Sequence, residues 1–345
     1  MPEGHTLHRL AGHLQETFAG RAVRVSSPQG RFAESAALLD GEVLTGAEAW
    51  GKHLFVAFPG DRHVHVHLGL YGVFAVHPAV DEGVSLGSRP SRASSCGVPR
   101  KAEEGGDAPA STTDDNAARR PQGGAQQAME PGDTPWVPEP VGQVRLRLVA
   151  GGDDGGDDRP AAYADLRGAT ACELLTGAQR DAVVARQGPD PLRADADPDR
   201  AWERIRGSRA PIGGLLMDQT VLAGVGNVYR AELLFRHRID PQRPGRTLRV
   251  GQWRAMWDDL VVLMAEGVRT GRIDTVRPEH TPEAMGRPPR RDDHGGEVYV
   301  YRRHGQPCLA CGASVRTTEL QQRNLFWCPR CQPRFRSRAT SGALG

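Results

Sequence analysis

Two pairs of cysteines near the C-terminus constrain the fold of this chain more than any other feature. Cys308 and Cys311 form one Cys-x-x-Cys knuckle, and Cys328 and Cys331 form a second, with residues 312–327 between them. Each knuckle offers two thiolates to one tetrahedral Zn²⁺, and a four-cysteine site leaves no coordination position open for catalysis. We therefore predict one structural zinc. The alternative, two disulfides, is rare in cytosolic proteins.

The stretch between the knuckles predicts a β-hairpin. Its sequence, ASVRTTELQQRNLFW, is typical of two strands with a turn near residues 322–324. Arg323 would then lie where a rigid hairpin can insert a guanidinium into a DNA groove.

Length and composition bound the architecture. The 345 residues suffice for two domains and a small third module. Apolar residues make up 38% of the chain, and no apolar run reaches the length of a membrane span. His5, His8 and Arg9 interrupt any signal-peptide core, so we expect a cytoplasmic protein with no membrane partner. Lysine is nearly absent, which makes Lys52 a residue of interest.

Hydrophobic periodicity divides the chain into a strand-rich first part and a helix-rich second part. Residues 5–18 carry apolar side chains at helical spacing, and short alternating runs follow them. Gly, Pro, Ser, Ala and charged residues dominate from about residue 80 to 135, which predicts a disordered insertion. We expect an N-terminal domain over 1–186 with this insertion at 80–135, a helical domain over 187–296, a zinc hairpin over 297–333 and a flexible tail over 334–345.

The segment Ile212–Arg230 predicts two helical stretches joined by a glycine turn. One helix should end near Leu222, and the next should begin near Asn227 after Ala223-Gly-Val-Gly226. Free amides at a helix N-terminus attract phosphate, and the Asn227 side chain offers another donor. The alternative is an ordinary helix-turn-helix contact in the core.

Four histidines lie close together in the strand-rich part, at positions 53, 63, 65 and 67. The last three alternate with apolar residues, so they share one face of a strand. A metal site is conceivable from this composition, but we interpret the histidines as strand and surface residues.

The chain begins Met1-Pro2-Glu3. Methionine is normally trimmed before proline, which would leave Pro2 with a free secondary amine. An α-amine titrates at about pH 8, roughly two units below lysine, so more of it is neutral and nucleophilic. Such an amine forms a Schiff base with a carbonyl-like carbon, and the Glu3 carboxylic acid can supply a proton. A simpler interpretation of Glu3 is that its charge favours the N-terminus of the following helix.

Three motifs in this order carry a family resemblance: the MPEG start, the segment LLMDQTVLAGVGNVYRAELLF, and the ending CLACG…RNLFWCPRCQ. The chain resembles the formamidopyrimidine-DNA glycosylase and endonuclease VIII family of base-excision repair enzymes, and is most similar to its actinobacterial endonuclease VIII-like branch. The resemblance covers essentially everything outside the insertion. It implies an α+β fold: an N-terminal two-layer β-sandwich with a flanking helix, then a helical domain with a helix-two-turn-helix motif and a four-cysteine zinc hairpin.

The resemblance also implies residue roles. Pro2 matches the nucleophile that attacks C1′ of the damaged nucleotide, and Glu3 matches the acid that assists this step. Lys52 matches a hairpin lysine that assists strand cleavage and contacts phosphate. Arg323 matches the zinc-hairpin arginine associated with the second elimination. The residues implied in DNA binding are Asn227 at a phosphate, Leu70 and Tyr71 in the gap left by the flipped base, and Arg167 at a groove or phosphate.

These matches predict a bifunctional DNA glycosylase and AP lyase that removes oxidised bases, pyrimidines before purines, and nicks the strand by β- and then δ-elimination. We expect damaged double-stranded DNA as the partner, one structural zinc, no nucleotide cofactor, a monomeric state and a cytoplasmic location at the nucleoid. The alternative is a non-catalytic damage-binding protein on the same fold. Such a protein would keep the zinc and Asn227 but would not need a free Pro2 amine.

Overall fold

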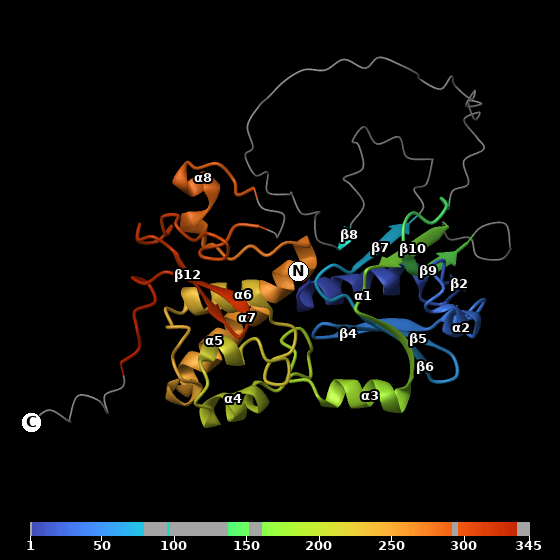
Figure 1. Ribbon diagram of the computed structural model, residues 1–345, viewed down its shortest axis with the longest axis horizontal. Helices are drawn as coiled ribbons and strands as arrows, with labels where there is room; N and C mark the ends of the chain where they lie inside the picture. The colour runs from blue at the N-terminus through green and yellow to red at the C-terminus, as the bar shows by residue number, and fades with distance from the viewer. Residues whose placement is uncertain (1, 79–94, 97–136, 152–160, 292–295, 337–345) are drawn as a thin grey trace, which may run out of the picture.

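The structure is a computed structural model that describes residues 2–78, 95–96, 137–151, 161–291 and 296–336. Its N-terminal part is built on β-sheets and its C-terminal part on helices, and the two lie side by side in Figure 1. The first helix, α1 (Gly4–Phe18), starts where these parts meet. The α+β class predicted from the sequence is confirmed. Among the described helices, none has the length and apolarity needed to cross a membrane.

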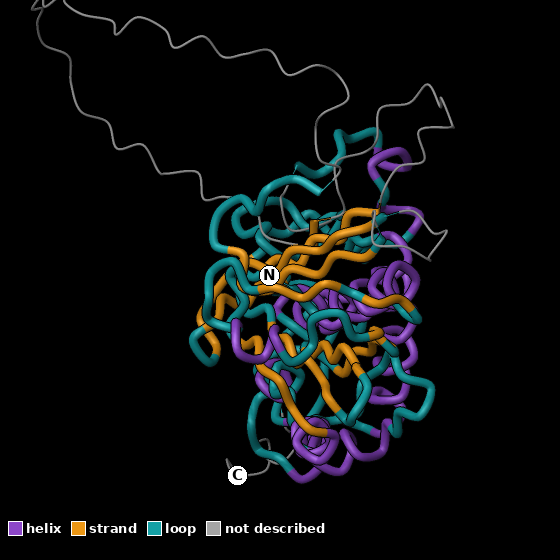
Figure 2. Tube along the Cα trace, turned by 90° about the vertical axis from the view of Figure 1, so that its right-hand side faces the viewer, coloured by secondary structure: helices purple, strands orange, loops and turns teal. Residues whose placement is uncertain are grey.

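Two antiparallel sheets form the N-terminal part and appear as separate layers of strands in Figure 2. The first sheet has the order β2-β9-β10-β7-β8, with strands at Arg24–Ser26, Val144–Ala150, Ala162–Arg167, Val73–Pro78 and Ser95–Cys96. The second has the order β11-β6-β5-β4, with strands at Ala171–Thr176, Arg62–His67, His53–Phe58 and Gly46–Trp50. A short pair, β1 (Arg21–Ala22) and β3 (Val43–Leu44), joins the end of α1 to the second sheet.

The two sheets and α1 share one hydrophobic core. Val64 and Val66 of β6 and Leu146 and Leu148 of β9 are almost fully buried in the same cluster as the apolar side of α1. Each such side chain contributes roughly 1.5–3 kcal/mol through removal from water. Because side chains alternate along a strand, the histidines of β6 point to the opposite face from Val64.

The insertion expected over residues 80–135 lies almost entirely outside the described residues. The exception is β8, whose two residues pair with β7 at Phe74 and Ala75. At this point the chain forms a sheet edge where the composition predicted no regular structure. Two short helices of the N-terminal part were also not predicted: α2 (Ala33–Ala37) and α3 (Gly177–Ala185).

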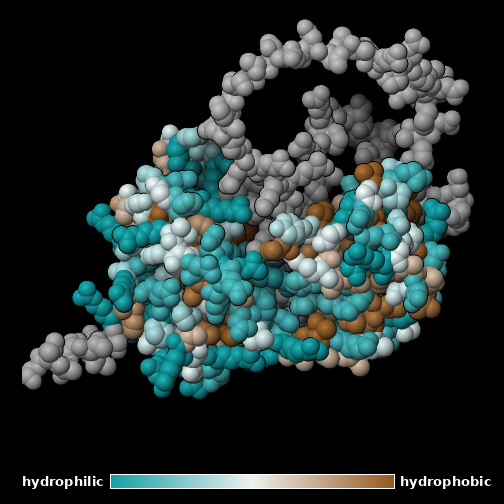
Figure 3. All heavy atoms as spheres, viewed as in Figure 1, coloured by the Kyte–Doolittle hydropathy of each residue, from teal (hydrophilic) through white to brown (hydrophobic). Residues whose placement is uncertain are grey.

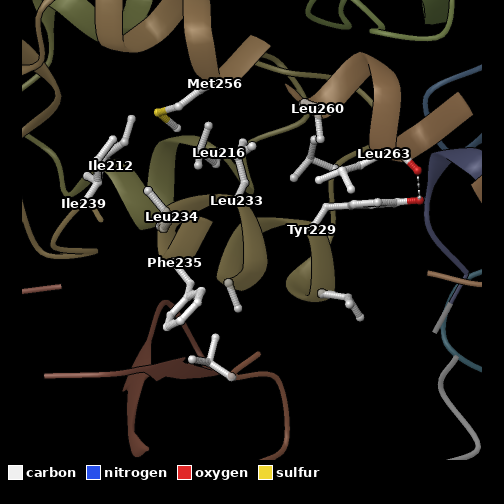
Figure 4. Packing of buried hydrophobic residues seen from close by; sticks show 14 of the residues in the cluster. Ile212, Leu216, Tyr229, Leu233, Leu234, Phe235, Ile239, Met256, Leu260 and Leu263 are labelled. Carbon is white, nitrogen blue, oxygen red and sulfur yellow. Dashed lines mark hydrogen bonds between the residues drawn. The ribbon is translucent and has the colours of Figure 1, made fainter. Parts of the chain in front are cut away.

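The C-terminal part contains α4 (Pro198–Gly207), α5 (Ile212–Leu215), α6 (Asn227–Arg236) and α7 (Val250–Thr270). Figure 4 shows how α6 fills the centre of this part, with the Tyr229 hydroxyl 3.4 Å from the Leu263 carbonyl oxygen of α7. The first helix of the glycine-turn segment is shorter than predicted. It ends at Leu215 instead of near Leu222, because Asp218 accepts a hydrogen bond from the backbone of Thr220 and turns the chain.

Two short helical turns follow α7: η2 (Pro278–His280) and α8 (Pro282–Met285). A further turn, η1 (Gly245–Thr247), precedes α7. Nearer the C-terminus, the zinc hairpin consists of β12 (Arg316–Leu320) and β13 (Arg323–Trp327). Its turn lies at Gln321 and Gln322, one residue earlier than predicted, so Arg323 opens the second strand.

The described chain ends at Arg336. Just before it, the Phe335 backbone N–H donates to Asp240, and the Arg243 guanidinium stacks on the Phe335 ring. The face seen in Figure 3 is largely hydrophilic over the C-terminal part. Hydrophobic residues are more frequent on this face over the sheets.

Candidate active site

Three glycines bring together the segments that carry the predicted catalytic residues. Gly4 begins α1, Gly51 lies in the β4–β5 turn, and Gly224 lies in the turn before α6. A Cβ at Gly224 would lie 3.3 Å from the Gly4 Cα and 3.5 Å from the Gly51 Cα. The Gly4 N–H also donates to the Gly224 carbonyl at 2.8 Å. Pro2, Glu3 and Lys52 are therefore held within one small region.

Glu3 is fully buried and binds the N-terminus of α6. Its two carboxylate oxygens accept backbone hydrogen bonds from Gly226 at 2.8 Å, Val228 at 2.8 Å and Tyr229 at 3.4 Å. It makes no capping hydrogen bond to α1. Its hydrogen bonds therefore stabilise the N-terminus of α6, and not that of α1, the helix that follows it in the chain.

Burial sets the protonation of Glu3. It raises the pKa of this carboxyl above its ordinary value, although the nearby Lys52 charge and the three amides act in the opposite direction. A glutamic acid with a raised pKa stays protonated at a higher pH and can donate its proton to a departing group.

The α6 amides expected to bind phosphate are thus already occupied by Glu3. Asn227 itself is 7% exposed, and its Nδ2 donates to the Asn324 carbonyl of β13 at 2.9 Å. In this structure Asn227 therefore connects α6 to the zinc hairpin. No local pattern in the sequence indicates that a side chain 223 residues away takes the Gly226 amide.

Lys52 lies in the β4–β5 turn and points at the same helix start. Its ammonium donates to the Val225 carbonyl at 2.8 Å. Burial lowers the pKa of Lys52 to about 8; Glu3 opposes this shift, and Arg323 adds to it. An amine with this pKa exchanges protons near physiological pH.

Arg230 is a site residue that the sequence argument missed. It is fully buried, hydrogen-bonds to Asn227 Oδ1, and donates to the Asn324 carbonyl at 3.1 Å. Burial lowers the pKa of Arg230 to about 10. The signal that could have revealed it is a charged residue in the middle of the apolar run Val228–Phe235, one turn after Asn227.

Asp190 is a second missed residue, and it fixes the Lys52 turn from the other side. The fully buried carboxylate accepts from the Gly51 N–H at 2.6 Å and lies 2.7 Å from His8 Nε2 of α1. The linker that contains Asp190 thereby clamps the turn against α1. A Gly-Pro-Asp-Pro sequence gives no hint of this contact.

The four cysteines meet as predicted. Their Sγ atoms all lie within 4.8 Å of one another, with 3.5 Å between Cys311 and Cys328 and 3.9 Å between Cys308 and Cys331. A tetrahedral site with Zn–S bonds of about 2.3 Å has S···S edges of about 3.8 Å, whereas a disulfide needs about 2.05 Å. The cluster is a structural zinc site, and the disulfide alternative is excluded for these sulfurs.

Arg323 lies on the zinc hairpin beside this region. Its side chain is exposed, and its charge acts on both Lys52 and Arg230. The neighbouring Asn324 carbonyl accepts from Asn227 and Arg230, which docks the hairpin on α6. The structure therefore places the strand that begins with Arg323 against α6, within electrostatic range of Lys52 and Arg230.

Leu70 and Tyr71 form the tip of the turn after β6. Tyr71 is 71% exposed and Leu70 is half-buried. The turn is tight: a Cβ at Gly69 would lie 2.5 Å from the Thr170 Cγ2, and one at Gly72 would lie 2.3 Å from the Leu68 oxygen. Side chains at its tip are therefore presented on a fixed support.

The Arg167 side chain is engaged within the first sheet and its surroundings. Its guanidinium donates to Asp165 at 2.8 Å and to the Val141 carbonyl at 2.9 Å. Asp165 also pairs with Arg147 inside the first sheet. In this structure Arg167 therefore forms an ion pair with Asp165 that stabilises the first sheet.

The histidines of β5 and β6 do not form a metal site. Within the described ranges, the four cysteines are the only group of three or more His, Cys, Asp or Glu ligand atoms close enough to hold an ion. All four histidines lie on strands, as predicted, but His65 is 5% exposed and is therefore buried, not a surface residue.

Comparison with known proteins places this geometry in a family. Residues 1–171 match the formamidopyrimidine-DNA glycosylase N-terminal domain, residues 187–278 match the H2TH domain of the same glycosylase, and residues 305–334 match the zinc finger found in FPG and IleRS.

Two individual relatives support the same family assignment. Endonuclease 8 1 of Mycobacterium tuberculosis is 49% identical over 332 residues, covering 96% of this chain and all of that protein. Probable endonuclease 8 2 of Streptomyces coelicolor is 29% identical over 96% of this chain and 94% of its own length.

A solved structure shares the fold. It is the Lactococcus lactis Fpg in complex with a DNA that contains an oxidised pyrimidine, with a TM-score of 0.61, 16% identity, and coverage of 96% of this chain and 100% of that one. Together these likenesses show that the chain belongs to the formamidopyrimidine-DNA glycosylase and endonuclease VIII family of base-excision DNA glycosylases with AP lyase activity, in its actinobacterial branch.

Proposed function

We propose that this protein excises oxidised bases, pyrimidines in preference to purines, from damaged double-stranded DNA through a Schiff base on Pro2. The observation that carries the proposal is the convergence of Pro2, Glu3 and Lys52 at the Gly4–Gly51–Gly224 contact. An amine, a buried acid and a lysine of lowered pKa in one place are the groups that such a reaction needs.

In the proposed reaction, Met1 is removed and the Pro2 nitrogen attacks C1′ of the damaged nucleotide. The base leaves with the bonding electrons of its glycosidic bond, and Glu3 assists by donating a proton. The Pro2 nitrogen then loses its proton, and the C1′–O4′ bond of the sugar ring opens as O4′ takes the electron pair and a proton. The resulting iminium at C1′ acidifies the C2′ proton. Loss of that proton, assisted by Lys52, expels the 3′ phosphate by β-elimination, and a second elimination that involves Arg323 expels the 5′ phosphate.

The proposed DNA contacts are Asn227 and Lys52 at phosphates, and Leu70 and Tyr71 at the gap left by the flipped base. The exposure of Tyr71 on a tight turn supports its role. Arg167 is the weakest of the proposed contacts, because its guanidinium must first leave Asp165. Asn227 must likewise exchange the Asn324 carbonyl for a phosphate.

We infer that the protein acts as a monomer without a nucleotide cofactor, in the cytoplasm at the nucleoid. We also infer a division into a catalytic domain over 1–186, with its insertion at 80–135, a DNA-binding helical domain over 187–296, a zinc hairpin over 297–333 and a tail over 334–345.

The test compares excision from duplexes that carry thymine glycol, 5-hydroxyuracil, 8-oxoguanine or an abasic site. We expect nicks at the first two and at the abasic site, with phosphates on both ends of the gap as δ-elimination requires. Binding without any nick would support the alternative, a damage-binding protein without catalysis. Faster excision of 8-oxoguanine would contradict the preference for pyrimidines.

A further inference from the structure

A row of hydrogen-bonded side chains crosses the outer face of the sheet that carries Lys52. Glu173 of β11 accepts from His65 of β6, with 2.9 Å between Oε1 and Nδ1. His65 Nε2 in turn lies 2.8 Å from Nδ1 of His53, the first residue of β5. The Glu173 side chain is 55% exposed, whereas that of His65 is 6% exposed. The row therefore runs from a solvated carboxylate through a buried imidazole to the neighbour of Lys52.

The carboxylate fixes the tautomers of both histidines. An ionised carboxylate only accepts, so His65 donates to Glu173 through Nδ1–H. A neutral imidazole has one N–H, so His65 Nε2 accepts, and its donor is His53 Nδ1–H. His53 is left with a lone pair on Nε2, for which the described part of the chain provides no hydrogen-bond partner.

His53 lies between two turns that are proposed to contact DNA. It directly follows Lys52 at the β4–β5 turn. Its ring centroid is 5.1 Å from that of His67, which precedes the turn with Leu70 and Tyr71. A DNA phosphate held between these two turns would therefore lie near the His53 ring.

Without DNA, the His53 imidazole is uncharged at neutral pH. Burial lowers the pKa of His53 to about 3, and the neighbouring histidines and the Lys52 charge act in the same direction. Further charged groups in the described part of this face include Glu48 on β4, Arg180 on α3, Arg193 in the interdomain linker, Glu173 on β11 and Asp61 beside His63. A phosphate next to Nε2 would act in the opposite direction, because an anion favours the imidazolium.

We propose that His53, supported by His65 and Glu173, is a proton-coupled contact to a DNA backbone phosphate. On binding, one proton from solvent attaches to the His53 Nε2 lone pair, and the new N–H donates to a phosphate oxygen. Glu173 stabilises the resulting cation through His65. The inference rests on the proposed DNA-binding function and extends it to residues that function does not use.

The test is calorimetric titration of the full-length protein with a duplex that carries a non-cleavable abasic-site analogue. Repeating the titration at pH 6.5 in buffers of different ionisation enthalpy gives the number of protons taken up. His53→Gln keeps a hydrogen-bond donor for phosphate but cannot titrate. Glu173→Gln keeps an acceptor for His65 but removes the charge. His63→Gln is the matched control, since His63 lies on the same face of β6, and the ion pair that its side chain makes within the described residues is with Asp61, at 3.6 Å.

An adjacent phosphate raises the pKa of His53 by at most about 3 units from its value of about 3. We therefore expect the wild type and His63→Gln to take up roughly a quarter of a proton beyond His53→Gln, with Glu173→Gln in between. Equal uptake by wild type and His53→Gln would overturn this inference while leaving DNA binding intact. Failure of every form to bind the duplex would overturn the proposed function together with the inference. Nitrogen NMR of the DNA-free protein gives an independent check, because an Nε2-protonated His53 would contradict the predicted tautomer.

Discussion

The Glu3 carboxylate lies 2.8 Å from the Val228 backbone nitrogen, although the two residues are 225 positions apart. This contact fastens the chain start to the N-terminus of α6. A negative group at that position satisfies free amides and is favoured by the helix dipole. The same contact holds Pro2 at the junction between the two parts of the molecule.

Replacement of Glu3 by glutamine should affect both stability and catalysis. An amide group must then face at least one of the backbone N–H groups that the carboxylate satisfied, which costs about 1–3 kcal/mol of unfolding free energy. Loss of the acid should slow base excision by roughly 10²–10⁴-fold. Thermal unfolding and single-turnover excision measure the two effects. Glu16→Gln, at an exposed position of the same helix, should change neither. A Glu3→Gln protein with wild-type excision would show that Glu3 is not the acid.

The glycine contact can be tested with a matched pair of alanine variants. Gly224 has φ +85° and neighbours within 3.5 Å, whereas Gly20 has φ +75° and no neighbour within 4 Å. Because alanine is strained in the left-handed conformation that both glycines adopt, each substitution lowers the free energy of unfolding by about 1–2 kcal/mol. Only Gly224→Ala should also separate α1 from the Lys52 turn, and we expect it to lower cleavage of abasic DNA at least tenfold more than Gly20→Ala. Equal losses in the two variants would mean that the close approach does not position the site.

The lowered pKa of Lys52 predicts a pH dependence of DNA binding. The ammonium form attracts phosphate, and it loses its proton as the pH rises through about 8. The affinity of wild type for an abasic-analogue duplex should therefore fall several-fold between pH 7 and 9 at constant salt. Arginine stays charged over this range, so Lys52→Arg should show a flatter profile. Identical profiles would exclude Lys52 as the titrating phosphate contact.

Metal analysis of the folded protein should find about one zinc per chain. Cys328→Ala should lose the metal, loosen the hairpin that carries Arg323 and reduce strand cleavage. Cys172→Ala is the control, because Cys172 lies in the β-sandwich core, and burial raises the pKa of its thiol to about 12. A metal content that is unchanged in Cys328→Ala would contradict the four-cysteine site.

Local patterns in the sequence predicted much of this molecule. Apolar spacing located α1 to within one residue, and cysteine spacing located the zinc cluster. The strand β4 was missed because its sequence, Gly-Ala-Glu-Ala-Trp, has little β-propensity and forms only through pairing with β5. The short helix α3 was missed because its stability depends on a capping box at Thr176 and on contacts with the second sheet.

The site was predictable residue by residue but not in its contacts. Glycine spacing correctly predicted a helix start at Asn227. No local pattern indicates that Glu3 takes the amides of that helix, or that Asp190 binds the Gly51 N–H. Such partners are set by tertiary packing between segments far apart in the sequence. For the same reason, the docking of Asn227 and Arg230 on the zinc hairpin emerged only from the structure.

The central claim, that the Pro2 amine is the nucleophile, is tested most directly by borohydride trapping on duplex DNA with an abasic site. The correctly processed wild type should form one covalent adduct, and peptide mapping should locate it at Pro2. Protein that keeps an N-terminal extension should bind the duplex but give no adduct, since its Pro2 nitrogen is an amide. Absence of an adduct from the wild type, or an undiminished adduct with the extension in place, would contradict the claim.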